Sequence, residues 1–113
     1  MARDDYFVLA YRILAYLYAC VKEGAEPDME HLSYKDPHFD VHEGYWNYVI
    51  KHLYRDGHID GIALVPLIGS KEPGIKYRKL EITPEGIRFL QENPTMSKAA
   101  DFLRTLKDIT PGL

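Results

Sequence analysis

The sequence has little of what marks a secreted, membrane-spanning or metal-clustered protein. One cysteine, Cys20, stands among 113 residues, so neither an internal disulfide nor a Cys-x-x-Cys metal motif is available. Arg12 interrupts the most apolar stretch, and no run approaches the roughly 18 apolar residues needed to cross a membrane. The first residues, MARDDYF, are acidic where a signal peptide would be basic. We therefore expect a cytoplasmic protein with no membrane span and with Cys20 as a small core residue.

Sequence motifs of common enzymes are also missing. No glycine-rich loop of phosphate-binding form occurs, and Ser33, Ser70 and Ser97 lack the context of a nucleophile elbow. The carboxylates are scattered along the chain as surface pairs. We therefore predict no enzymatic activity, no catalytic residue and no cofactor.

The chain has five histidines, which are common metal ligands. His38, Asp40 and His42 stand close together, and His31 is not far away. A helical pair of histidine ligands must lie on one continuous helix, and His38 precedes the start of the helix expected here. We predict that these side chains are structural or solvent-exposed, and that they hold no metal.

Positive charge is not in excess, since the net charge is −3. Residues 1–41 hold four basic and eight acidic groups, whereas residues 42–83 hold six basic and five acidic groups. Four of those six basic groups lie in residues 71–80, which contain only one acidic group. This cluster fits phosphate contacts, and it fits equally a hairpin end solvated by lysines.

The stretch from 42 to 57 is the element around which the rest of the chain is organised. An apolar stripe at helical spacing predicts that one face is buried, namely Trp46, Val49, Ile50 and Leu53. The opposite face carries Tyr48, Lys51 and Arg55, with Asn47 and His52 on its flanks. Asp40 or His42 would stand just before the helix, Asp40 and Glu43 have the spacing of a capping box, and Gly57 is typical of a helix end.

The other elements follow in the order of a winged helix-turn-helix. Apolar periodicity predicts a first helix from about 5 to 23, and Asp28 would cap a short helix over 29–34. The runs 59–65 and 75–82 predict a two-stranded hairpin, the wing, and Thr83 with Pro84 begins another helix. A last helix is expected over 97–109. The fold class is thus α+β, mostly helical, with residues 1–113 as a single winged helix-turn-helix domain with an extra C-terminal helix.

The first helix is apolar on nearly all sides, so it must be covered on both of them. Either the last helix of the same chain or the matching helix of a second copy would provide that cover. We favour a homodimer formed through the first and last helices.

The fold suggests how double-stranded DNA would be bound. Helix 42–57 would enter the major groove, and the wing over 66–78 would reach adjacent phosphates. Asn47 would contact adenine, Tyr48 a thymine methyl group or the backbone, and the two basic groups of the helix guanine edges or phosphate. The predicted DNA-binding residues are Asn47, Tyr48, Lys51, Arg55, Lys71, Lys76 and Arg78.

Nine tyrosines among 113 residues support a second interpretation. Tyrosine suits protein interfaces as well as base stacking, because it offers a large amphipathic surface with little entropy to lose. Most of the nine, such as Tyr6, Tyr45 and Tyr77, are expected in or beside the core. The alternative function is therefore a non-enzymatic protein-interaction or dimerisation module on the same fold.

Two segments of the sequence resemble a known family. They are LYRDGHIDG at the end of the central helix and the tail ITPEGIRFLQENPTMSKAADFLRTLKDI. Together they are similar to the YjcQ family of small winged-helix proteins of bacteria and their prophages. The resemblance implies the fold, an intracellular bacterial or phage setting and a role in DNA binding, and it implies no catalytic residue. The longer region from 24 to 39 departs from the family pattern.

Overall fold

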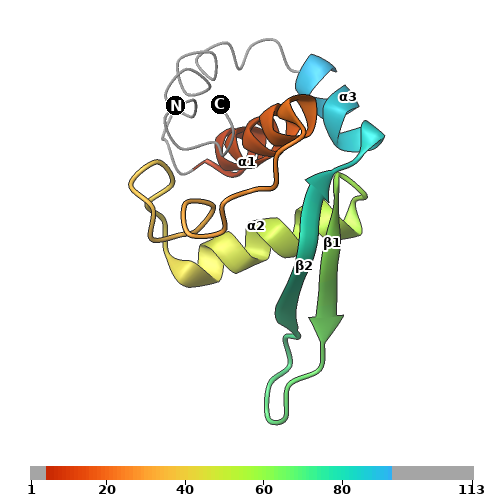
Figure 1. Cartoon of the computed structure of the whole chain (residues 1–113). Helices are drawn as coiled ribbons and strands as arrows, with labels where there is room; N and C mark the ends of the chain where they lie inside the picture. The colour runs from red at the N-terminus through yellow and green to blue at the C-terminus, as the bar shows by residue number, and fades with distance from the viewer. Residues whose placement is uncertain (1–4, 93–113) are drawn as a thin grey trace.

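The computed structural model describes residues 5–92 and forms a small α+β fold (Figure 1). Its elements are α1 (Tyr6–Glu23), α2 (Glu43–Arg55), β1 (Ile59–Val65), β2 (Gly74–Ile82) and α3 (Pro84–Glu92). This order of helices and hairpin is compatible with a winged helix. The last helix predicted over 97–109 lies outside the described residues.

Helix α1 begins and ends where the sequence predicts. The Asp5 carboxylate accepts a hydrogen bond from the Phe7 amide, and Gly24 ends the helix in a left-handed conformation with φ of 68°. Its inner side supplies much of the core, namely Leu9, Ala10, Ile13, Leu14, Ala15, Tyr16, Leu17 and Cys20. Burial raises the pKa of the Cys20 thiol, as expected for a packed core cysteine.

Helix α2 buries the whole apolar stripe predicted for it, Trp46, Val49, Ile50 and Leu53. The predicted capping box is wrong, because Asp40 ends the preceding turn with φ of 44° instead of capping the helix. His42 takes that place, and its Nδ1 atom accepts a hydrogen bond from the Gly44 amide at 2.9 Å. The last helical residue is Arg55, and Gly57 just beyond it adopts φ of 82°, which confirms it as the left-handed residue expected at the end of this helix.

The short helix predicted over 29–34 does not form, and turns occupy this segment. The Asp28 carbonyl accepts hydrogen bonds from the amides of His31 and Leu32, which makes a single helical turn. The Asp28 carboxylate accepts a hydrogen bond from the Glu30 amide, as predicted for a helix cap. The Ser33 hydroxyl then accepts from the Lys35 amide, which a continuing helix would have paired with a carbonyl. Leu32 is buried as predicted, but Met29 is exposed.

The hairpin has the predicted strands and one irregularity that the sequence does not reveal. β1 and β2 pair antiparallel from Ile59 opposite Ile82 to Val65 opposite Gly74, with a shift of register between Asp60 and Ile62. Gly61 stands at this bulge with φ of 89°, and a Cβ atom there would lie 1.8 Å from the Lys79 carbonyl oxygen. The bulge turns the outer half of the hairpin, so that Ile75 and Tyr77 face α2.

Helix α3 is held against the end of α2 by Thr83. The Thr83 hydroxyl donates to the Gly57 carbonyl at 2.5 Å and accepts from the Gly86 amide at 3.1 Å. Position 86 requires a glycine for this close packing of α3, because a Cβ atom there would lie 2.4 Å from the His58 carbonyl oxygen. The predicted cap at Thr83 is therefore confirmed.

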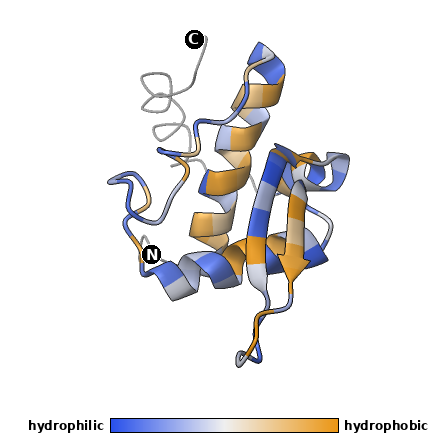
Figure 2. Cartoon of the chain, turned by 60° about the horizontal axis from the view of Figure 1, so that its bottom comes forward, coloured by the Kyte–Doolittle hydropathy of each residue, from blue (hydrophilic) through white to orange (hydrophobic). Residues whose placement is uncertain are grey.

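The core lies between α1, α2 and the inner half of the hairpin. Figure 2 shows hydrophobic residues along α1 and, at the other end of the molecule, continuing from β1 into the connecting loop. No helix within residues 5–92 is long and apolar enough to cross a membrane.

Candidate nucleic-acid interface

The outer face of α2, defined here as Tyr48, Lys51, His52 and Arg55, is turned away from the core. Tyr48 is 53% exposed and Arg55 is also exposed. The Tyr48 ring lies 4.3 Å from the His52 ring between centroids, and 6.2 Å from Tyr6 of α1 in an edge-to-face arrangement. These contacts fix the orientation of Tyr48 without burying it.

Lys51 has a partner that the sequence does not suggest. Its Nζ atom lies 3.5 Å from the Oε2 atom of Glu72, which belongs to the loop joining the two strands. This loop, residues 66–73, is called the wing loop. The Lys51 side chain is only 12% exposed, whereas the Glu72 side chain is 73% exposed. The ion pair therefore draws the wing loop toward the outer face of α2.

A recess of about 280 Å³ lies between the outer face of α2 and the wing loop. It is lined by Gly44, Tyr48, Lys51, His52, Arg55 and Glu72. Two basic groups, two rings and one carboxylate thus border the same hollow. Of the predicted residues, the structure brings Tyr48, Lys51 and Arg55 together here.

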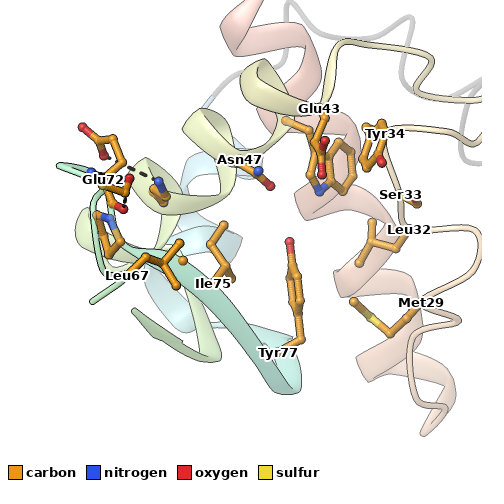
Figure 3. Close-up of a pocket in the computed structure, with 15 residues that line it drawn as sticks. Met29, Leu32, Ser33, Tyr34, Glu43, Asn47, Leu67, Glu72, Ile75 and Tyr77 are labelled. Carbon is orange, nitrogen blue, oxygen red and sulfur yellow. Dashed lines mark hydrogen bonds and ion pairs between the residues drawn. The ribbon is translucent and has the colours of Figure 1, made fainter. Parts of the chain in front are cut away.

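A larger groove of about 540 Å³ lies on the other side of Lys51, between α2, β2 and the turns around residue 32 (Figure 3). Asn47 points into it from α2, and Ile75 and Tyr77 point into it from β2. Burial raises the pKa of Tyr77, and a hydrogen bond with the Trp46 side chain partly opposes this rise. Glu43 and Glu72 stand at its rim, so this groove is mixed in charge and largely apolar.

The basic residues of the wing do not gather at one place. Lys71 is exposed in the wing loop near Glu72. Lys76 lies between Ile75 and Tyr77, so strand alternation places it on the face of β2 away from the groove. Arg78 and Lys79 are exposed within the bulge. None of these four residues lines the recess, to which the hairpin contributes Glu72.

Two of the clustered histidines, His31 and His38, flank the buried carboxylate of Asp36. Asp36 is 6% exposed, and its two oxygens lie 2.9 Å from His31 Nδ1 and 2.6 Å from His38 Nδ1. Its own burial would raise the pKa of Asp36, but hydrogen bonds from His31 and His38 outweigh that effect and lower it. The hydrogen bond to Asp36 raises the pKa of His31. Among the described residues, no group of three or more His, Cys, Asp or Glu side chains is arranged to hold a metal ion.

Two features of this interface are not predicted from the sequence. The first is the ion pair between Glu72 and Lys51. The two residues are 21 positions apart, so in the sequence Glu72 shows only as one acidic residue of the wing. The apolar pair Leu67 and Ile68 lies in a segment whose glycine and proline content indicates a turn. A signal is nevertheless present there, since two large aliphatic residues between Pro66 and Gly69 are unusual in a solvated loop.

Comparison with known proteins found a match to a family model and nothing further. No curated protein and no solved structure matches the sequence. The family model described as YjcQ protein matches residues 11–109, which include most of α1 and all of α2, the hairpin and α3. This span is most of the chain, and it agrees with the resemblance seen in the sequence. The chain therefore belongs to the YjcQ family.

Proposed function

We propose that this protein binds double-stranded DNA and acts as a transcriptional regulator in a bacterium or its prophage. In this proposal the outer face of α2 lies in the major groove, and the wing loop lies on the adjacent backbone. The observation that carries it is the recess in which Tyr48, Lys51 and Arg55 of α2 border the wing loop. In helix-turn-helix proteins a recognition helix lies in the major groove, and α2 with the wing loop beside it would take that place here.

The charges around the recess support moderate affinity. Lys51, Arg55 and Lys71 can each neutralise a phosphate, whereas Glu72 competes with DNA for Lys51. The excess of acidic groups in residues 1–41 adds a weak long-range repulsion. Binding would therefore depend strongly on salt and on a few close contacts.

The second candidate function, a protein-interaction module, is favoured by a different observation. Phe7 is 54% exposed beside Tyr6 and Tyr48, so three aromatic rings meet at the surface between α1 and α2. Exposed aromatic groups of this kind are typical of protein interfaces. The same surface would serve a homodimer through α1, which also exposes Val21.

Fluorescence anisotropy separates the two candidates. A labelled random duplex is titrated with the protein at several salt concentrations, and log Kd is plotted against log salt. DNA binding predicts a linear dependence with a slope of about 0.9 for each phosphate contact, or roughly 3 in total. No binding at low salt would reject the DNA-binding proposal. Sedimentation of the protein alone over a range of concentrations would then test the dimer.

A further inference from the structure

The end of the wing loop exposes an aliphatic side chain. Ile68 is fully exposed to solvent, and its neighbour Leu67 is 50% exposed. The residues that follow, Ser70, Lys71 and Glu72, are polar or charged. A branched apolar side chain held entirely in water gains nothing for the stability of the folded chain. Its place at the end of the hairpin leaves it free to contact another molecule.

The wing loop is built to present Ile68 in one position. The Ser70 amide donates to the Leu67 carbonyl at 3.2 Å, and the Ser70 hydroxyl accepts from the Glu72 amide at 3.2 Å. Gly69 adopts φ of 79°, which completes the turn. Leu67 folds back over Gly74, where a Cβ atom would lie 3.2 Å from the leucine Cδ1. Glu72 then ties the loop to Lys51 on α2.

The loop projects on the side that the proposed DNA contact requires. Figure 1 shows α1 above α2 and the end of the hairpin below α2. Because the apolar stripe of α2 packs toward the core, its outer face looks to the side on which the hairpin projects. A duplex lying along the outer face of α2 would therefore meet the wing loop.

We propose that Ile68 is a wedge residue, which enters the minor groove beside the α2 contact, partly unstacks one base step and bends the duplex. This inference rests on the proposed function. An aliphatic side chain has no donor or acceptor with which to read a base edge or to bind phosphate. Apolar side chains presented to the minor groove act instead by insertion between base pairs, which kinks the duplex. Lys71 supplies the phosphate contact that holds the loop there, and flexible pyrimidine–purine steps are the favoured sites.

The test combines binding with circularisation of DNA. Binding is followed by anisotropy, and bending by the rate at which ligase closes a random fragment of about 100 bp, shorter than the persistence length of about 150 bp. Saturating wild-type protein should accelerate closure about tenfold or more, because a bent fragment brings its ends together. Ile68→Ser should lose this acceleration and keep the salt slope of binding, since no phosphate contact is removed.

Lys71→Ala is the matched variant in the same loop. It should lower the affinity and reduce the salt slope by about 0.9, yet still accelerate circularisation at saturation. Both side chains are exposed, so both variants should keep the wild-type Tm. Two results would overturn the wedge proposal and leave the proposed DNA binding standing. One is a wild-type protein that binds DNA without accelerating ring closure, and the other is an Ile68→Ser variant that still accelerates it. A wild type that does not bind DNA at all would overturn the proposed function together with the wedge.

Discussion

Lys51 on α2 and Glu72 in the wing loop form an ion pair, with 3.5 Å between Nζ and Oε2. The pair joins the two parts of the chain proposed to contact DNA, and it occupies the lysine that a phosphate would take. Its energy is small, because Glu72 is largely exposed and such pairs contribute at most about 1 kcal/mol. A phosphate can therefore displace Glu72, and the free protein keeps Lys51 in place until then.

Replacing Glu72 by glutamine should tighten DNA binding. The variant Glu72→Gln removes the competing carboxylate and one negative charge near the duplex. We expect about a three- to tenfold lower Kd at low salt, and a salt slope that is higher by up to about 0.9. Anisotropy titrations of the two proteins at several salt concentrations measure both. An unchanged or weaker affinity would mean that Lys51 does not contact DNA.

Removing the basic groups of α2 should abolish binding and leave the fold intact. In Lys51→Ala with Arg55→Ala, two phosphate or base contacts are lost, whereas the free energy of unfolding should fall by only about 1–2 kcal/mol, mainly because the Lys51 stem is largely buried. Lys79→Ala is the matched control, because Lys79 lines a different hollow beside residues 24–27. Anisotropy and thermal unfolding are measured on all proteins. Retained binding in the double variant would refute the assigned face of α2.

Two glycines with similar φ should respond very differently to alanine. Gly61 has φ of 89°, and a Cβ atom added there would lie 1.8 Å from the Lys79 carbonyl oxygen, whereas Gly69 has φ of 79° and open space around it. Gly69→Ala should cost about 1–2 kcal/mol from the left-handed conformation alone. Gly61→Ala should cost at least about 1 kcal/mol more, because the bulge must also move. Urea unfolding measures both values, and equal losses would contradict the bulge.

The network around Asp36 predicts how stability changes with pH. His31 has a raised pKa in the folded protein, so its contribution is complete below about pH 6.5, its unfolded pKa, and is lost as pH rises through the folded pKa. Asp36 has a lowered pKa, so its contribution is present above about pH 4 and is lost as pH falls through the folded pKa. The turns before α2 should therefore be most stable between about pH 4 and pH 6.5.

Thermal unfolding of wild type and His31→Gln at about pH 5.5 and pH 8 tests this dependence. The wild type should lose more of its Tm on raising the pH than the variant does. Asp36→Asn, which removes the buried carboxylate shared by His31 and His38, should cost about 1–3 kcal/mol at the lower pH. Equal pH responses in wild type and His31→Gln would show that the hydrogen bond to Asp36 carries no proton-linked stability.

Local signals in the sequence are enough to predict several elements of the fold. The apolar stripe of α2, the extent of α1 and the start of α3 at Thr83 all appear as predicted. Each depends on side-chain spacing within a few residues, so no knowledge of the folded chain is needed. The two strands are predicted for the same reason.

Other features depend on partners distant in the sequence or on competition among local bonds, and these appear only in the folded chain. Asp28 begins one helical turn, but turns follow instead of a helix because Ser33 and Asp36 offer the backbone and the histidines competing bonds. Leu80 and Ile82 are buried, so strict alternation along β2 would turn Lys76 to the same face and Ile75 and Tyr77 to the opposite one. The bulge at Gly61 reverses this order, so that Ile75 and Tyr77 face α2 and Lys76 points away from it. Hydrophobic periodicity within a helix indicates which of its residues are buried, as for α2, but only the folded backbone decides which exposed charges share a surface.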